Sequence, residues 1–349
     1  MSKNTRSNLI TYGIVIVAFI VMQTLISTGS ISSLMEGLMI PLCIYIILAV
    51  SLNLVVGILG ELSLGHAGFM CAGAFASAFF SKCMRDVITI APLRFFLALL
   101  IGVAVAAVFG IIIGIPVLRL KGDYLAIVTL AFGEIIKNLV NVLFIGKDSN
   151  GFHFSTKDVM DLNMEADGTV IVNGPQGITG TPQDSTFVIG VILILITLFI
   201  VINMVNSRDG RAIMAIRDNR IAAESVGINV TKYKLMAFTV SAALAGAAGV
   251  LYAHNLSTLT ANTNNFGYNM SINILVFVVL GGIGSIRGSM IAAVVLTLLP
   301  ELLRGLSDYR MLIYAIVLII MMLFNWSPKA IEWREKYLSF GKKKKEAVK

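Results

Sequence analysis

Residues 187–206 read FVIGVILILITLFIVINMVN, twenty positions without a charged side chain, and residues 207–211 that follow read SRDGR. A helix of about 20 apolar residues is long enough to cross the hydrocarbon core of a bilayer. Arginines directly after such a helix are typical of the cytoplasmic side of a membrane. This stretch therefore predicts a membrane-spanning helix followed by a cytoplasmic segment.

Nine further apolar stretches extend this interpretation to most of the chain. The composition agrees, since 57% of the residues are hydrophobic and only 13% are charged, whereas soluble domains carry about 25% charged residues. We therefore expect an all-α, polytopic integral membrane protein with about ten transmembrane helices. They are predicted at about 10–28, 38–57, 66–81, 94–116, 124–145, 187–206, 235–254, 270–284, 289–304 and 311–325.

Two glycine-rich breaks interrupt these stretches, GILGELSLGHAG at 57–68 and GGIGSIRG at 281–288. Irregular backbone at membrane depth is tolerated where protein or water satisfies its polar groups. Some helices are therefore predicted to be broken around a central path, although glycines that serve only close helix packing explain the pattern equally well. The candidate hinge glycines are Gly60, Gly65, Gly281, Gly282 and Gly284.

The basic residues predict how the chain is oriented. With both termini in the cytoplasm, 19 Lys and Arg residues lie inside and seven outside, with Lys137 within a span, as the positive-inside rule requires. Residues 1–9 are then a cytoplasmic N-terminus, 10–325 a transmembrane domain, and 326–349 a basic cytoplasmic tail beside anionic lipid. The net charge of +8 is placed for a membrane surface, so binding to nucleic acid is not expected.

The largest external segment is predicted at 146–186, and it carries six acidic side chains against two lysines. Within it, residues 164–172 read MEADGTVIV, which predicts a hairpin that turns at Asp167-Gly168. A segment of this length is either a solvated loop or a docking surface for an external partner.

The segment 207–234 is predicted to be a cytoplasmic coupling loop that meets a soluble partner. Asp218 is expected to cap a short helix over 219–226, and Gly227 is expected to end it in a left-handed conformation. Arg220 and Glu224 are spaced for an ion pair on that helix. Such a short helix is unstable alone in water, so it must lie against the membrane domain or a partner. The alternative is a basic loop that only sets topology.

Polar side chains mark one face of the span at 124–145. Glu134, Lys137, Asn138 and Asn141 share that face, and ionisable residues in a membrane normally face protein or water. The Glu134–Lys137 pair either joins helices or serves as an ion site, whereas Asn138 and Asn141 are candidates to line a pathway. His66, beside the first glycine break, is expected to form a hydrogen bond at a helix end.

Other chemistry is not expected. The chain has no GxxxxGK[ST] phosphate loop, catalytic constellation or histidine pair at metal-ligand spacing. We therefore predict no catalytic residue, no metal and no cofactor bound by this chain. If ATP drives transport, the ATPase is a separate polypeptide.

Several ordered motifs resemble the permease subunits of bacterial branched-chain amino-acid ABC importers, specifically the LivM type, from about Met39 to Phe324. They are GELSLGHAG at 60–68, KGDYLAIVTL at 121–130, FGEII at 132–136, GPQGI at 174–178, RAIMAIRD at 211–218, AAESVGIN at 222–229 and LPELLR at 299–304. The resemblance differs at Asn173, where the family often has another glycine, and at the end of the last span.

The resemblance implies two cytoplasmic ABC ATPases that bind ATP and Mg, a second related permease and an external solute-binding protein. It also implies a coupling helix within 216–229 that docks on an ATPase. The candidate docking residues are Ile216, Arg217, Asp218, Asn219, Ala222, Ala223, Glu224 and Gly227.

The function expected is that of a transport subunit, not an enzyme, in a bacterial plasma membrane. It would carry leucine, isoleucine or valine inward by ATPase-driven alternating access. One alternative is an ABC permease for urea or another small solute. A second is an ion-coupled secondary carrier with Glu134 as its ion site, and a third, a membrane enzyme, lacks a catalytic constellation.

Overall fold

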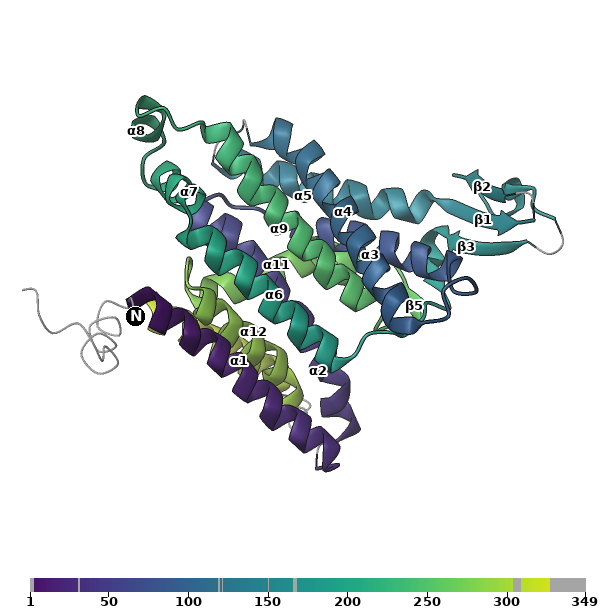
Figure 1. Ribbon diagram of the computed structural model, residues 1–349, viewed down its shortest axis with the longest axis horizontal. Coiled ribbons are helices and arrows are strands. Elements are labelled where there is room, and N and C mark those ends of the chain that lie inside the picture. The colour runs from purple at the N-terminus through teal and green to yellow at the C-terminus, as the bar shows by residue number, and fades with distance from the viewer. Residues whose placement is uncertain are drawn as a thin grey trace, which may run out of the picture.

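The computed structural model describes residues 3–30, 32–118, 120, 122–149, 151–165, 168–303 and 309–326. Helices that run roughly side by side form most of it, and a small sheet extends from one end (Figure 1). The predicted basic tail beyond Trp326 lies outside the described residues.

A helix is present at each of the ten predicted spans. These helices are α1 (Lys3–Ser27), α2 (Ser33–Asn53), α3 (His66–Cys83), α4 (Ala91–Val117), α5 (Asp123–Val142), α6 (Phe187–Asn206), α9 (Val230–Ala253), α11 (Tyr268–Gly281), α12 (Ile286–Leu302) and α13 (Arg310–Trp326). Within the described part of the chain, α1, α2, α4, α5, α6 and α9 are long and apolar enough to cross a membrane. For the other four helices, a full crossing stays a prediction.

The centre of the bundle is formed by α2, α3 and α9, whose residues are mostly buried. Glycines let these helices approach closely: a Cβ added at Gly73 of α3 would lie 2.6 Å from the Cα of Gly246 in α9. Small residues at helix contacts are the usual way to pack membrane helices, because the backbones then touch. Gly73 and Gly246 lie outside the two glycine breaks, for which close packing was one predicted alternative. Within the breaks a similar close approach occurs, since a Cβ added at Gly57 would meet the Gly284 amide nitrogen.

The chain is not purely helical, which corrects the expected fold class. Strands β1 (Phe144–Asp148), β2 (Gly151–Ser155) and β3 (Thr169–Asn173) form an antiparallel sheet in the order β2-β1-β3. Strands β4 (Ile178–Thr179) and β5 (Thr258–Leu259) form a second pair. The apolar, β-branched and aromatic residues of these short segments suit a half-buried sheet.

The predicted hairpin at 164–172 is wrong in its pairing. Strand β3 does form, but its partner is β1, and the hairpin of the sheet joins β1 to β2. Met164 and Glu165 are not in a strand, and Asp167 lies outside the described residues. Because β3 pairs with β1, strand β1 has a hydrogen-bonded neighbour on each side. A hairpin within 164–172 alone would not provide this.

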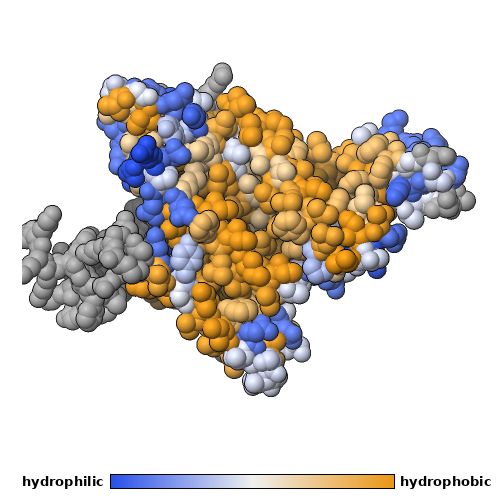
Figure 2. Space-filling view, viewed as in Figure 1, coloured by the Kyte–Doolittle hydropathy of each residue, from blue (hydrophilic) through white to orange (hydrophobic). Residues whose placement is uncertain are grey.

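The surface separates polar ends from an apolar belt. Figure 2 shows hydrophobic residues across the middle of the visible face, with hydrophilic residues around α7–α8 at one end and at the sheet on the other. A belt of this kind is what lipid contact requires.

Candidate functional site: the α7–α8 helices and the glycine breaks

Two short helices follow α6, namely α7 (Arg208–Asp218) and α8 (Arg220–Ser225). Ser207 caps α7, since its hydroxyl accepts a hydrogen bond from the Gly210 amide at 3.1 Å. Asn219 caps α8 in the same way, with its Oδ1 3.1 Å from the Ala222 amide. The predicted cap is therefore wrong by one residue, because Asp218 is the last residue of α7.

Sequence reasoning missed α7 altogether. Its signals were a capping serine, an acidic residue in the first turn and a basic one in the last, all of which favour a helix. The end of α8 was predicted correctly, because Gly227 has a φ of +86°. The expected Arg220–Glu224 ion pair also forms, at 3.1 Å on an exposed face.

The two helices have a small core of their own, formed by Ile216, Ala223 and Val230. Ile216 and Ala223 were candidate docking residues, but they are only 4% and 3% exposed. Their side chains therefore hold α7, α8 and the start of α9 together. The other candidates, Arg217, Asp218, Asn219, Ala222, Glu224 and Gly227, are exposed.

Two exposed apolar residues were missed. Ile221 is 80% exposed and Val226 is 75% exposed, on a helix pair that is otherwise polar at its surface. Large exposed apolar patches mark interaction sites, whereas single exposed apolar residues are common, so these two residues are candidates for protein contact. In the sequence, these two apolar residues stand close to the charged residues Arg220 and Glu224, and this proximity could have identified them.

Arg217 joins α7 to the first glycine break. Its Nη1 donates a hydrogen bond to the carbonyl oxygen of Gly57 at 3.0 Å, and its Nε and Nη2 bond the Asp218 carboxylate. Gly57 lies in a π-helical turn, η1 (Leu54–Leu59), at the end of α2. A π-helical turn is a local irregularity found often at functional sites. Gly60, with a φ of +78°, ends that turn directly against the Arg217 side chain.

The two glycine breaks touch each other. The buried side chain of Asn53 donates to Ser289 Oγ at 3.0 Å and accepts from the Gly284 amide at 2.9 Å. Gly282 and Gly284 both have positive φ, at +94° and +82°. Three of the five candidate hinge glycines thus occupy backbone conformations that favour glycine, and the two breaks form one contact region.

A second connection runs from α9, which is separated from α8 by four residues. Lys234 forms an ion pair with Glu61 of the first break, and their side chains are only 5% and 15% exposed. The two helices on either side of α8 are therefore each attached to the first glycine break by a cation, α7 by Arg217 and α9 by Lys234.

The polar face of α5 forms contacts within the chain. Glu134 pairs with Lys137, which also bonds Thr263 Oγ1 at 3.2 Å. The other Glu134 oxygen accepts from the Tyr268 amide at 2.9 Å, and Asn141 donates to the Ala261 carbonyl at 3.0 Å. The pair itself lies within α5, and the further hydrogen bonds of its two members to Thr263 and Tyr268 agree with the joining alternative. Asn141 takes part in the same join, whereas Asn138 is exposed.

His66 and Gly65 lie at the start of α3. His66 is 2% exposed, and its Nε2 is 2.8 Å from Ser51 Oγ of α2. The Ser51 carbonyl in turn accepts from Ser241 of α9 at 2.6 Å. This is the expected helix-end hydrogen bond, and it joins three helices at the centre of the bundle. Gly65 lies against Thr129 of α5, with no room for a side chain.

An apolar bundle with broken helices and an exposed helix pair attached to the breaks defines a multi-pass membrane protein of the permease class. The sequence pattern of the family described as branched-chain amino acid transport system / permease component matches residues 34–324, and the chain belongs to this family. Its members are transport components, so the chain is not an enzyme.

Three relatives bear on the function. The high-affinity branched-chain amino acid transport system permease protein LivM of Salmonella typhimurium is 35% identical over 82% of this chain and 67% of its own length. LivH, named as a permease protein of the same kind of system in that organism, is 28% identical over 45% of this chain and 50% of its own length. The ribose import permease protein RbsC of Escherichia coli is 28% identical over 80% and 81%. No solved structure matches the chain.

Proposed function

We propose that this chain is the membrane-spanning permease subunit of an ATP-driven importer of branched-chain amino acids in a bacterial inner membrane. The observation that carries the mechanism is the path from α8 through Arg217 and Lys234 to the glycine breaks. The similarity to LivM supports leucine, isoleucine or valine as the substrate, and the weaker similarity to RbsC keeps another small solute, such as urea or a sugar, as the alternative.

The proposed partners are two cytoplasmic ATPases, an external solute-binding protein and a second permease. The similarity of the chain to both LivM and LivH supports the second permease, since two related permease proteins carry the name of one kind of system. The exposed Ile221 and Val226 support an ATPase on α8. In this arrangement both termini and the α7–α8 pair are cytoplasmic, and the sheet is external.

Closure of the ATPases on ATP would move α8, and the two cation contacts would carry that movement to Gly57 and Glu61. The breaks would then shift together, because Asn53 joins them, and change the pore from inward-open to outward-open. Gly60, Gly282 and Gly284 are proposed as the hinge positions. Asn138 is the remaining candidate to line the pathway.

A secondary carrier with Glu134 as its ion site is less well supported. Both carboxylate oxygens of Glu134 already have partners within the chain, one from Lys137 and one from the Tyr268 amide. An ion site needs oxygens that are available to the ion, so this geometry favours a joining role.

The test is purification of the tagged chain in mild detergent from its native membrane, with identification of the co-purifying proteins by mass spectrometry. We expect two ATPases and a second permease, and ATP-dependent uptake of radiolabelled leucine when the complex and the solute-binding protein are reconstituted in vesicles. Uptake of leucine by the chain alone, driven by an ion gradient without ATP, would overturn the proposal.

A further inference from the structure

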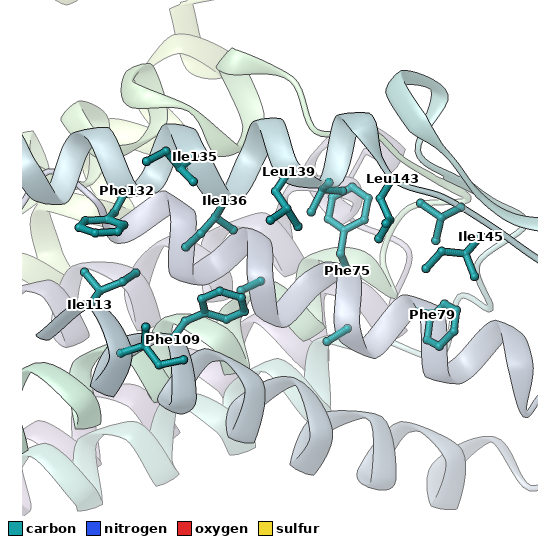
Figure 3. Close-up of a pocket in the computed structure, with 15 residues that line it drawn as sticks. Phe75, Phe79, Phe109, Ile113, Phe132, Ile135, Ile136, Leu139, Leu143 and Ile145 are labelled. Carbon is teal, nitrogen blue, oxygen red and sulfur yellow. The ribbon is translucent and has the colours of Figure 1, made fainter. Parts of the chain in front are cut away.

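A crevice of about 310 Å³ lies between α3, α4 and α5 (Figure 3). Fifteen residues line it, and all of them are Ala, Val, Ile, Leu or Phe. Phe75 and Phe79 come from α3, Phe109 from α4 and Ile136 from α5. A cavity without a polar group at its walls selects a hydrocarbon ligand, because any polar group placed in it would lose its hydrogen bonds to water.

The crevice lies between two helices of the apolar belt, α4 and α5, both of which are long and apolar enough to cross a membrane. Its edges are exposed: Ile112 of α4 is 59% exposed, and Ile135 and Leu139 of α5 are 55% and 56% exposed. A hydrocarbon chain in the membrane can therefore enter from the side without passing through water.

At the sheet end, the crevice continues onto one face of the sheet. Ile145 of β1 and Val172 of β3 line its end, and Lys147 is two residues beyond Ile145, hence on the same face. Lys147 is paired across the strands with Phe152 and Ile145 with Phe154, so the aromatic side chains share that face.

On this face of the sheet, an aromatic side chain lies between the apolar crevice and the lysine. The Lys147 ammonium lies 5.9 Å from the centre of the Phe152 ring, and Phe152 contacts Phe79 of the crevice with ring centres 5.9 Å apart. The long side chain of a lysine at the edge of a membrane-spanning apolar surface reaches the level of the lipid headgroups, and a lysine near that surface attracts anionic lipid.

The walls fit an acyl chain better than a helix of another protein. Helix contacts in membranes use small residues and polar side chains, so that backbones approach closely, as Gly73 and Gly246 do within this bundle. The residues that line the crevice are mostly bulky phenylalanine, isoleucine and leucine.

We propose that this crevice is a binding site for one acyl chain of an anionic phospholipid from the leaflet on the sheet side. The acyl chain of the lipid lies along Phe75, Ile136 and Leu139, and the phosphate of its headgroup binds Lys147. The proposal goes beyond the transport function and does not depend on which solute is carried.

The test uses the intact transport complex in nanodiscs that contain phosphatidylglycerol and phosphatidylcholine, with retained lipids counted by native mass spectrometry. Ala76→Leu fills the crevice, and its matched control Ala104→Leu makes the same change on the exposed surface of α4. Lys147→Gln removes the cation, and Lys157→Gln removes another exposed lysine of the same external region.

We expect Ala76→Leu to lose the retained lipid whatever its headgroup. Lys147→Gln should lower the retention of phosphatidylglycerol about fivefold, the effect of one juxtamembrane charge. Retention of phosphatidylcholine should fall less, because its choline cation offsets the charge of the phosphate that Lys147 binds. Both controls should behave as the wild type. Equal retention in all variants would overturn the site.

Photo-crosslinking provides a second measurement in case Ala76→Leu fails to assemble. Benzoylphenylalanine placed at Leu139, on the exposed edge of the crevice, should crosslink to lipid in the wild-type background. A crosslink to a protein subunit instead would show that another chain covers the crevice and would refute the lipid site. Leucine uptake, measured in parallel, is independent of this result and tests the transport function alone.

Discussion

Arg217 Nη1 donates a hydrogen bond to the Gly57 carbonyl oxygen at 3.0 Å, across 160 residues of sequence. This contact attaches the last turn of α7 to a π-helical turn in which α2 ends. A charged donor to a carbonyl is among the stronger hydrogen bonds in proteins, so the two elements move together as long as the bond holds.

Replacement of Arg217 by glutamine should separate ATP hydrolysis from transport. A hydrogen bond to a charged group contributes about 1.5–3 kcal/mol, which corresponds to a loss of transport of about ten- to a hundredfold. Transport and ATPase activity are measured on the same reconstituted complex. A fall of both activities in proportion would instead indicate that Arg217 serves only assembly.

Gly60→Ala should impair the complex more than Gly29→Ala. Both glycines have positive φ, +78° and +65°, and both end a helix, so alanine is strained at each. The added Cβ at Gly60 would lie 2.5 Å from Arg217 Cγ, whereas Gly29 has open space. The left-handed alanine conformation costs about 1–2 kcal/mol at either site, and the difference in melting temperature and uptake measures the contact with Arg217. Equal effects would contradict the importance of this contact.

Asn53→Leu should destabilise the purified complex. The substitution removes the acceptor of the Gly284 amide, whereas Ser289 Oγ loses the bond from Asn53 but still donates to the Ser285 carbonyl. An unsatisfied buried group costs about 1–3 kcal/mol. Asn138→Leu, at an exposed position of α5, is the control. It should change the free energy of unfolding by no more than about 0.5 kcal/mol, and the melting temperature correspondingly little. An unchanged melting temperature for Asn53→Leu would contradict the joined arrangement of the two breaks.

Val226→Asp tests the surface of α8. The same substitution at Val87 is a matched control, because the two valines are 75% and 74% exposed and Val87 lies outside the α7–α8 pair. A charge placed in an apolar protein contact costs about 2 kcal/mol or more, so co-purification of the ATPases should fall with Val226→Asp alone. Loss with both variants would point to folding, and loss with neither would exclude α8 as a contact.

Glu134→Gln should reduce stability while uptake of leucine by the surviving complex stays ATP-dependent. Lys137 is buried beside Glu134, and removal of one partner of a buried ion pair costs about 3–5 kcal/mol. Glu134→Gln combined with Lys137→Met should recover most of that loss in a thermal-unfolding assay. Complete loss of uptake by a stable double variant would favour the ion-site interpretation.

The sequence was informative wherever a local signal decides local structure. The apolar runs of about twenty residues predicted helices at ten places, and the structure has a helix at each. Gly227 ended its helix in the expected left-handed conformation. Motif order also gave the family, which the match over 34–324 confirms.

The sequence did not predict in the same way which distant segments of the chain contact each other. Valine-rich residues 169–173 predicted a strand, but nothing local specifies β1 as the partner. The Arg217–Gly57 and Asn53–Gly284 contacts join residues 160 and 231 positions apart, so a single sequence gives no register between them. Ile216 was assigned to a partner surface for a different reason: α7 was not predicted, so the face that Ile216 turns to the local core with Ala223 and Val230 was not recognised.

The contact between Gly73 and Gly246 has a consequence for which sequences this protein tolerates. A methyl group on either residue would meet backbone or a small side chain of another helix, which no rotamer change relieves. Neither glycine belongs to the sheet or to the α7–α8 pair, and neither lines the crevice between α3, α4 and α5. In a library of random variants selected for growth on leucine, these two positions should nevertheless retain glycine as strictly as any residue that binds a partner.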